Sequence, residues 1–135
     1  MKQFAMVTLC AAAVFCLAVG PANALPQFKK DFTDKYVEGS GNAAWEETVK
    51  TAGCNVCHVK GEGKDVRNAY GEVLAKLIEG DAKDRLAKAK EAGSDDAEKE
   101  KLTKEMMEAF KKAETMKSPS GATFGELLKA HKLPE

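Results

Sequence analysis

Two cysteines and a histidine stand close together in the stretch TAGCNVCHVKGEGK, residues 51–64. Cys54 and Cys57 are separated by two residues, and His58 directly follows the second cysteine. Four kinds of chemistry use such a spacing: a redox-active dithiol, a zinc site, a short disulfide loop, or covalent attachment of haem with the histidine as an iron ligand. The rest of the chain has to distinguish among these four.

The first 24 residues have the pattern of an export signal. Lys2 supplies a short positive region, an apolar run extends from Phe4 to Val19, and Ala22-Asn23-Ala24 places small residues before a cleavage site. The apolar run is shorter than the roughly 20 residues that a membrane-spanning helix needs. We therefore expect residues 1–24 to be a signal peptide and residues 25–135 to be one exported, periplasmic domain without a membrane span.

Removal of this signal peptide reduces the number of cysteines in the mature domain. Cys10 and Cys16 would be lost with it, so that no disulfide framework is possible beyond the pair Cys54 and Cys57. The whole chain carries 21 basic and 21 acidic residues, and this balance argues against a nucleic-acid-binding protein.

Helix signals dominate the expected domain, and strand signals are nearly absent. Apolar residues recur at helical spacing over residues 28–37, 45–52, 66–78, 102–113 and 124–131. Between these segments, residues 81–104 carry a run of charges that predicts a solvated helical hairpin. The sequence therefore predicts an all-α fold, a small bundle of five or six short helices.

Polar residues at the expected helix starts support this prediction. Asn42 is a suitable N-cap for the second helix, and Asp65 is the expected cap of the third. Thr123 and Glu126 have the spacing of a capping box for the last helix.

The predicted fold and the available ligands argue against three of the four readings of the motif. A thioredoxin-like dithiol requires a βαβ pattern, which this chain lacks. A structural zinc needs four ligands, and beyond the motif the expected domain offers only the remote His131. A disulfide between Cys54 and Cys57 would close a very short loop and leave His58 without a role. Covalent attachment of one haem uses all three residues, with His58 as proximal ligand of the iron.

The segment CNVCH resembles the attachment site of c-type cytochromes, and the order of helix, motif, helices, methionine-containing loop and last helix resembles the small class I members. The resemblance implies haem c bound through Cys54 and Cys57, export, and single-electron transfer between redox proteins. Class I members commonly have a proline after the motif that helps orient the histidine, whereas this chain has none between His58 and Pro119.

The sixth ligand of the iron has three candidates in the sequence. The class I resemblance points to Met116, in the loop before the last helix, as the distal ligand. His131, near the end of the chain, is the second choice. Met106 lies on the apolar stripe of Leu102 and Phe110, which predicts a core position instead.

Aromatic residues are expected to cover the faces of the porphyrin, and Trp45 and Tyr70 are the first candidates for this packing. No acid and base pair accompanies the motif, so the sequence predicts an electron carrier and no enzyme. A haem-based binder or sensor of small ligands, or a haem subunit of a larger redox enzyme, remains as an alternative. We expect a monomer that meets redox protein partners.

Overall fold

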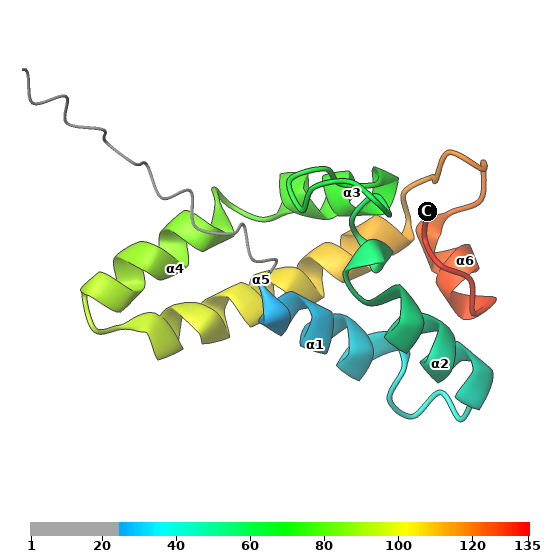
Figure 1. Cartoon of the computed structure of the whole chain (residues 1–135), viewed down its shortest axis with the longest axis horizontal. Helices are drawn as coiled ribbons and strands as arrows, with labels where there is room; N and C mark the ends of the chain where they lie inside the picture. Colours follow the sequence, from blue (N-terminus) through cyan, green and yellow to red (C-terminus); the bar gives the residue numbers. More distant parts are fainter. Residues whose placement is uncertain (1–24) are drawn as a thin grey trace, which may run out of the picture.

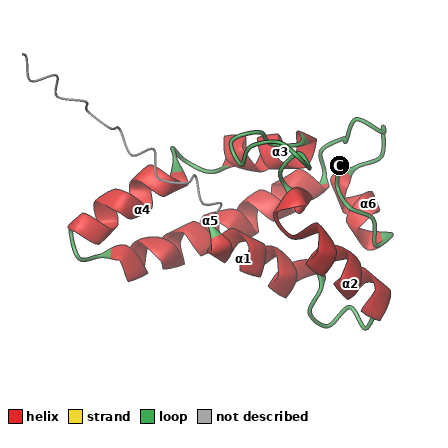
Figure 2. Cartoon of the chain, in the orientation of Figure 1, coloured by secondary structure: helices red, strands yellow, loops and turns green. Residues whose placement is uncertain are grey.

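The computed structural model describes residues 25–135, and the predicted signal peptide, residues 1–24, lies outside the described residues. This part of the chain is all-α, without strands (Figure 1, Figure 2). The predicted fold class is thereby confirmed. Its helices are α1 (Pro26–Tyr36), α2 (Ala43–Ala52), the short 3₁₀ helix η1 (Gly53–Val56), α3 (Ala69–Leu77), α4 (Ala82–Glu91), α5 (Asp95–Glu114) and α6 (Phe124–Lys129).

The long helix α5 is the centre of the arrangement. It contacts α1, α3, α4 and α6, while α2 runs directly into η1 (Figure 1). Its buried positions Leu102, Met106, Phe110 and Ala113 follow the helical repeat that the sequence predicts. Within residues 25–135, no helix is both long and apolar enough to cross a membrane.

Aromatic side chains form the interior between α1, α3, α5 and α6. The rings of Phe32 and Phe110 meet edge to face at 6.0 Å between centroids, and Tyr70 lies 5.1 Å from Phe124. Tyr70 has no exposed surface. Such tilted contacts match the quadrupoles of the rings, so these residues fix the angles at which the helices pack.

Two of the three predicted helix caps are confirmed. The side chain of Asn42 accepts a hydrogen bond from the backbone N–H of Trp45, and Thr123 with Glu126 forms the complete capping box. The prediction that Asp65 caps the third helix is wrong. That helix begins at Ala69, and Asn68 caps it instead.

The late start of α3 has a physical cause in the preceding loop. Residues 59–66 fold back on themselves, because the N–H of Val59 donates to the carbonyl of Val66 at 3.1 Å and His58 bridges to Arg67. Val66, expected on the buried stripe of the helix, is 37% exposed. The loop therefore takes three residues, 66–68, that local helix spacing assigns to α3.

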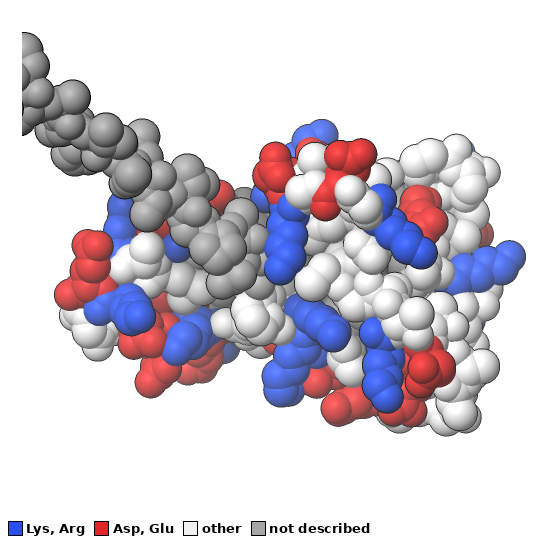
Figure 3. Space-filling view, in the orientation of Figure 1, with Lys and Arg blue, Asp and Glu red and all other residues white. Residues whose placement is uncertain are grey.

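The charged segment 81–104 forms a helical hairpin, as predicted. Its two helices are also joined to each other by ion pairs. Arg85 of α4 contacts Glu98 at 2.6 Å and Glu105 at 2.7 Å, both on α5. Its guanidinium also donates to the carbonyl of Glu79 at 2.7 Å. Basic and acidic side chains are mixed over this part of the surface (Figure 3). The hairpin is thus fastened by one arginine that serves two carboxylates.

Candidate functional site

The motif residues lie on a tight turn at the end of α2. Gly53 ends that helix with a φ of 56°, a conformation that side chains other than glycine rarely adopt. The N–H groups of Cys57 and His58 then both donate to the carbonyl of Cys54, at 3.2 and 3.1 Å. The backbone thereby presents the three side chains from one short turn.

The two cysteines are free thiols in different surroundings. Cys54 is exposed, whereas Cys57 is half-buried. Burial raises the pKa of the Cys57 thiol to about 12, and the neighbouring Cys54 adds a smaller effect in the same direction. A thiol with so high a pKa stays protonated near neutrality, unlike the activated nucleophile of a redox dithiol.

The described residues also offer no cluster of side chains that could bind a metal ion on its own. Among residues 25–135, no group of three or more His, Cys, Asp or Glu side chains lies close enough to hold a metal ion. The described part of the chain therefore supplies no four-ligand set of the kind that a structural zinc site uses.

The imidazole of His58 is oriented by the loop that follows it. Its Nδ1 lies 3.3 Å from the carbonyl oxygen of Val66. Because a carbonyl can only accept a hydrogen bond, this contact assigns the proton to Nδ1 and leaves the lone pair of Nε2 available to a ligand. The Val66 carbonyl thus fixes the orientation of the His58 ring.

Asn68 joins the motif turn to the start of α3. Its side-chain amide donates to the carbonyls of Val56, at 3.0 Å, and Asn55, at 3.3 Å, while its Oδ1 accepts from the N–H of Gly71 at 2.9 Å. Its own N–H donates to the carbonyl of Cys57 at 3.0 Å. One side chain therefore both caps α3 and holds the turn.

Gly71 allows this close approach. A Cβ at this position would lie 2.0 Å from the carbonyl oxygen of Cys57. Asn68, Gly71 and the Val66 carbonyl belong to the site but were not predicted from the sequence. The available signal was Asn68 as an alternative helix cap, since asparagine caps helices as well as aspartate does.

A cavity of about 1,040 Å³ opens on the inner side of the motif, and Cys54, Cys57 and His58 all line it. Its wall is mainly apolar, and α1, α3 and α5 contribute to it together with residues of α2, η1 and α4. Its apolar residues are Leu25, Pro26, Phe28, Phe32, Val49, Val56, Leu74, Ala75, Ile78, Ala82, Met106 and Phe110. The cavity is at the large end of the range of about 300–1,000 Å³ that is typical of sites for organic ligands.

Cationic side chains lie around the same cavity. Lys29, Lys64, Arg67 and Lys83 line it together with the acids Asp65 and Asp81. None of the four cations belongs to an ion pair within residues 25–135, in contrast to Arg85 and Lys35, which are paired. The cavity thus combines an apolar interior with basic groups that are free to meet carboxylates.

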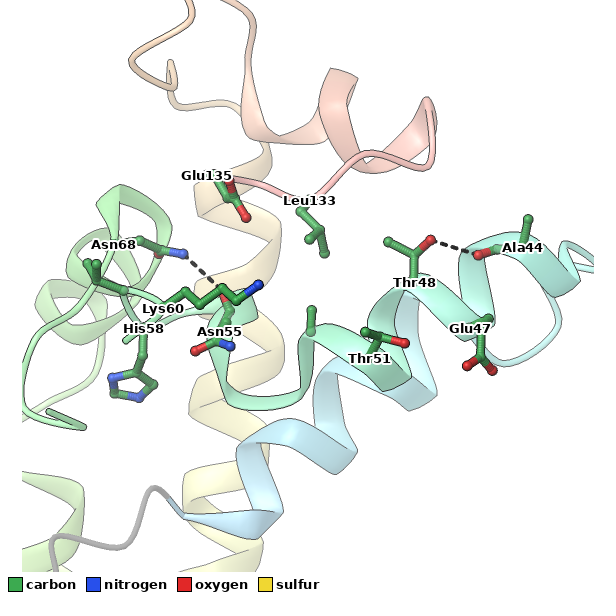
Figure 4. A pocket seen from close by; sticks show the side chains of 12 residues that line it. Ala44, Glu47, Thr48, Thr51, Asn55, His58, Lys60, Asn68, Leu133 and Glu135 are labelled. Atoms are coloured by element: carbon green, nitrogen blue, oxygen red, sulfur yellow. Dashed lines mark hydrogen bonds between the residues drawn. The ribbon is translucent and has the colours of Figure 1, made fainter. Parts of the chain in front are cut away.

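A second hollow, of about 830 Å³, lies between α2, the motif and the end of the chain (Figure 4). His58 borders it, but neither cysteine does. In Figure 4 a dashed line marks the bond from the Asn68 amide to the Asn55 carbonyl, and both of these residues line the hollow. Of the two cavities, only the larger brings together all three motif side chains.

The structure places the candidate sixth ligands very differently. Met116 follows the end of α5, is 43% exposed and lines neither cavity. His131 lies beyond α6, where its Nδ1 is 2.9 Å from the Asn42 amide and its ring packs on Trp45. Met106 is buried on α5, as its apolar stripe predicts, and its side chain lines the larger cavity.

Trp45 and Tyr70 are buried, but neither lines the larger cavity. The indole N–H of Trp45 donates to the carbonyl of Tyr36, and this bond turns the ring toward α1. Phe28, Phe32 and Phe110 are the aromatic residues of the cavity wall. Helical spacing identified the buried aromatics but did not show which of them face the cavity.

Comparison of the chain with protein-family models, with curated proteins and with solved structures finds no match.

Proposed function

We propose that this protein is an exported monohaem c-type cytochrome that carries single electrons between redox proteins. One observation supports this above all others: Cys54, Cys57 and His58 line the same large, mainly apolar cavity. A redox dithiol needs no such cavity, and a structural zinc needs four ligands, which the described residues do not bring together.

The residues of the cavity fit haem c in their chemistry. The thiols of Cys54 and Cys57 would form thioether bonds to the vinyl groups, and His58 would offer Nε2 to the iron, its Nδ1 being held by the Val66 carbonyl. When bound, the haem iron supplies a one-electron redox centre. The apolar walls exclude water, and the unpaired cations at the cavity would attract the two propionates.

For the sixth ligand we propose Met106 in place of Met116. A ligand must reach the interior of the cavity, and only Met106 among the described methionines lines it together with the motif. Thioether ligation favours the ferrous state and suits an electron carrier. A carrier of this kind needs no catalytic acid or base.

The first experiment tests attachment. The protein, expressed with its leader in a host that matures c-type cytochromes, should have the mass of its processed chain plus one haem under denaturing conditions, since thioether bonds survive unfolding. Cys54→Ala and Cys57→Ala should each lose stable attachment. A wild-type mass equal to the bare polypeptide would refute the proposal.

The second experiment tests the sixth ligand. Met106→Leu should abolish the near-infrared sulfur-to-iron charge-transfer band of the oxidised protein and lower its reduction potential, whereas Met116→Leu, the matched control, should change neither. The opposite result would return the assignment to Met116. A ferrous wild type that is high-spin and binds carbon monoxide at once would instead favour the small-ligand binder.

A further inference from the structure

A carboxyl group is buried where α1 packs against α5. Asp31 is only 4% exposed, and its Oδ2 has no hydrogen-bond partner among the described residues. Its Oδ1 accepts one long hydrogen bond, 3.4 Å, from the hydroxyl of Thr103 on α5. An ionised carboxylate with so little compensation is costly in a protein interior, whereas the protonated acid is not.

Asp31 lies directly behind the wall of the larger cavity. Its neighbours on α1, Phe28 and Phe32, both line that cavity. On α5, Thr103 lies one helical turn before Met106, which also lines it. The carboxyl group therefore has cavity-lining residues as its chain neighbours on α1 and, through Thr103, on α5.

The charges around Asp31 leave its own charge uncompensated. The charged residues that act on it are Lys30 and Asp34, both on α1 and paired with each other. From α5 it meets the uncharged Thr103, while Lys99 and Lys104 form ion pairs along their own helix. Burial raises the pKa of Asp31, and the hydrogen bond from Thr103 opposes this only in part.

Polar groups also connect Asp31 with the surface. The side-chain amide of Gln27 donates to the hydroxyl of Thr103, which in turn donates to Asp31. The same amide reaches the carbonyl of Lys99 in the exposed first half of α5. The carboxyl group is therefore joined by polar side chains, and not by the apolar wall alone, to the exposed first half of α5.

We infer that Asp31 is a proton-binding site coupled to the electron that the protein carries, an inference that rests on the proposed function. Asp31 takes up one proton from solvent when one electron arrives from the donor protein. It returns this proton to solvent when the acceptor protein removes the electron. The added negative charge and the added proton compensate each other, so the reduced protein binds the proton more tightly than the oxidised protein does.

The test is the reduction potential of the holoprotein as a function of pH. Because Asp31 does not line the cavity itself but adjoins residues that do, the electron should change the proton affinity of Asp31 on the order of tenfold. The potential should therefore fall with rising pH between two plateaus about 59 mV apart, the equivalent of a tenfold ratio for one electron. Asp31→Asn should lose this step and stay near the acidic plateau, because its side chain is permanently neutral.

Asp34→Asn is the matched control on the same helix. It should keep the step, moved to slightly lower pH, because removal of a nearby negative charge lowers the pKa of Asp31. A redox-induced infrared difference spectrum should show a carboxylic acid band that Asp31→Asn lacks. A step that persists in Asp31→Asn would assign the proton to another group and overturn the inference. A wild-type potential independent of pH would do the same, and in both cases the attached haem would leave the proposed function intact.

Discussion

Gly71 is the residue at which the motif turn and α3 come closest, and replacing it with alanine tests whether this contact organises the site. The new Cβ would lie 2.0 Å from the carbonyl oxygen and 2.9 Å from the carbonyl carbon of Cys57. It would also lie 3.2 Å from the Cβ of Arg67. Two of these atoms belong to the backbone, so no side-chain rotation can relieve the contact.

The expected loss of folding stability can be worked out from these contacts. To restore ordinary contact, α3 would have to retreat from the turn by roughly 1 Å, and overpacking of this kind costs about 1–3 kcal/mol. The retreat would also stretch the bonds from Asn68 to the carbonyls of Cys57 and Val56, both 3.0 Å long, at about 1 kcal/mol each. Alanine returns up to about 1 kcal/mol of helix propensity. We therefore expect Gly71→Ala to lower the free energy of unfolding by about 2–4 kcal/mol.

Thermal unfolding of the protein, followed by circular dichroism, measures this loss of stability. For a domain of this size, 1 kcal/mol corresponds to about 4 °C, so the midpoint should fall by about 10 °C. Glu72→Ala, an exposed change at the next position of α3, is the control for helix propensity and should shift the midpoint by no more than about 2 °C. A Gly71→Ala protein as stable as the Glu72→Ala control would show that α3 does not depend on the turn, and would refute the reasoning.

Three further outcomes follow from the contacts around the site. Asn68→Asp keeps the cap of α3 but loses the amide donor to the motif, and should cost about 1–3 kcal/mol in denaturant unfolding, whereas an effect below about 0.5 kcal/mol would contradict the role of that donor. Arg85→Lys cannot serve two carboxylates in parallel and should speed amide hydrogen exchange throughout α4 while leaving the visible spectrum unchanged. The hydrogen bond from Arg85 holds the pKa of Glu105 below its ordinary value of about 4.5, so this ion pair stabilises the fold above that pH and is lost as the pH falls through the lowered pKa. Urea unfolding of Glu105→Gln should accordingly show a weaker loss of stability in acid than the wild type does, and an equal loss would count against the pair.

The sequence was sufficient to predict the helices because all of the α-helices except α4 have their own apolar period and most have their own caps. The repeat of Leu102, Met106 and Phe110 predicts the buried face of α5, and Asn42 and Thr123 cap the helices as expected. The start of α3 was not predictable in this way. Asp65 and Asn68 are equally good caps locally, and a contact with the distant Cys57 carbonyl decides between them.

The candidate site shows the same division between local and non-local information. The motif itself specified Cys54, Cys57 and His58 as a unit, and the structure places all three around one cavity. Helical spacing could show that Met106 is buried, but it could not show whether its side chain meets a solid core or a cavity. That difference depends on where α1 and α3 lie, and no repeat within α5 contains that information.

The charged hairpin illustrates how such a cavity is completed. Its run of charges resembles a solvated surface, yet the residues that lead into α4, from Gly80 to Lys83, line the cavity that the motif opens into. Arg85 holds this segment in place, because its two carboxylate partners both belong to α5, the helix that also carries Met106 and Phe110. A clamp between α4 and α5 therefore fixes the far edge of the site relative to its apolar wall. The charge pattern that most suggested an independent surface element is what connects this element to the site.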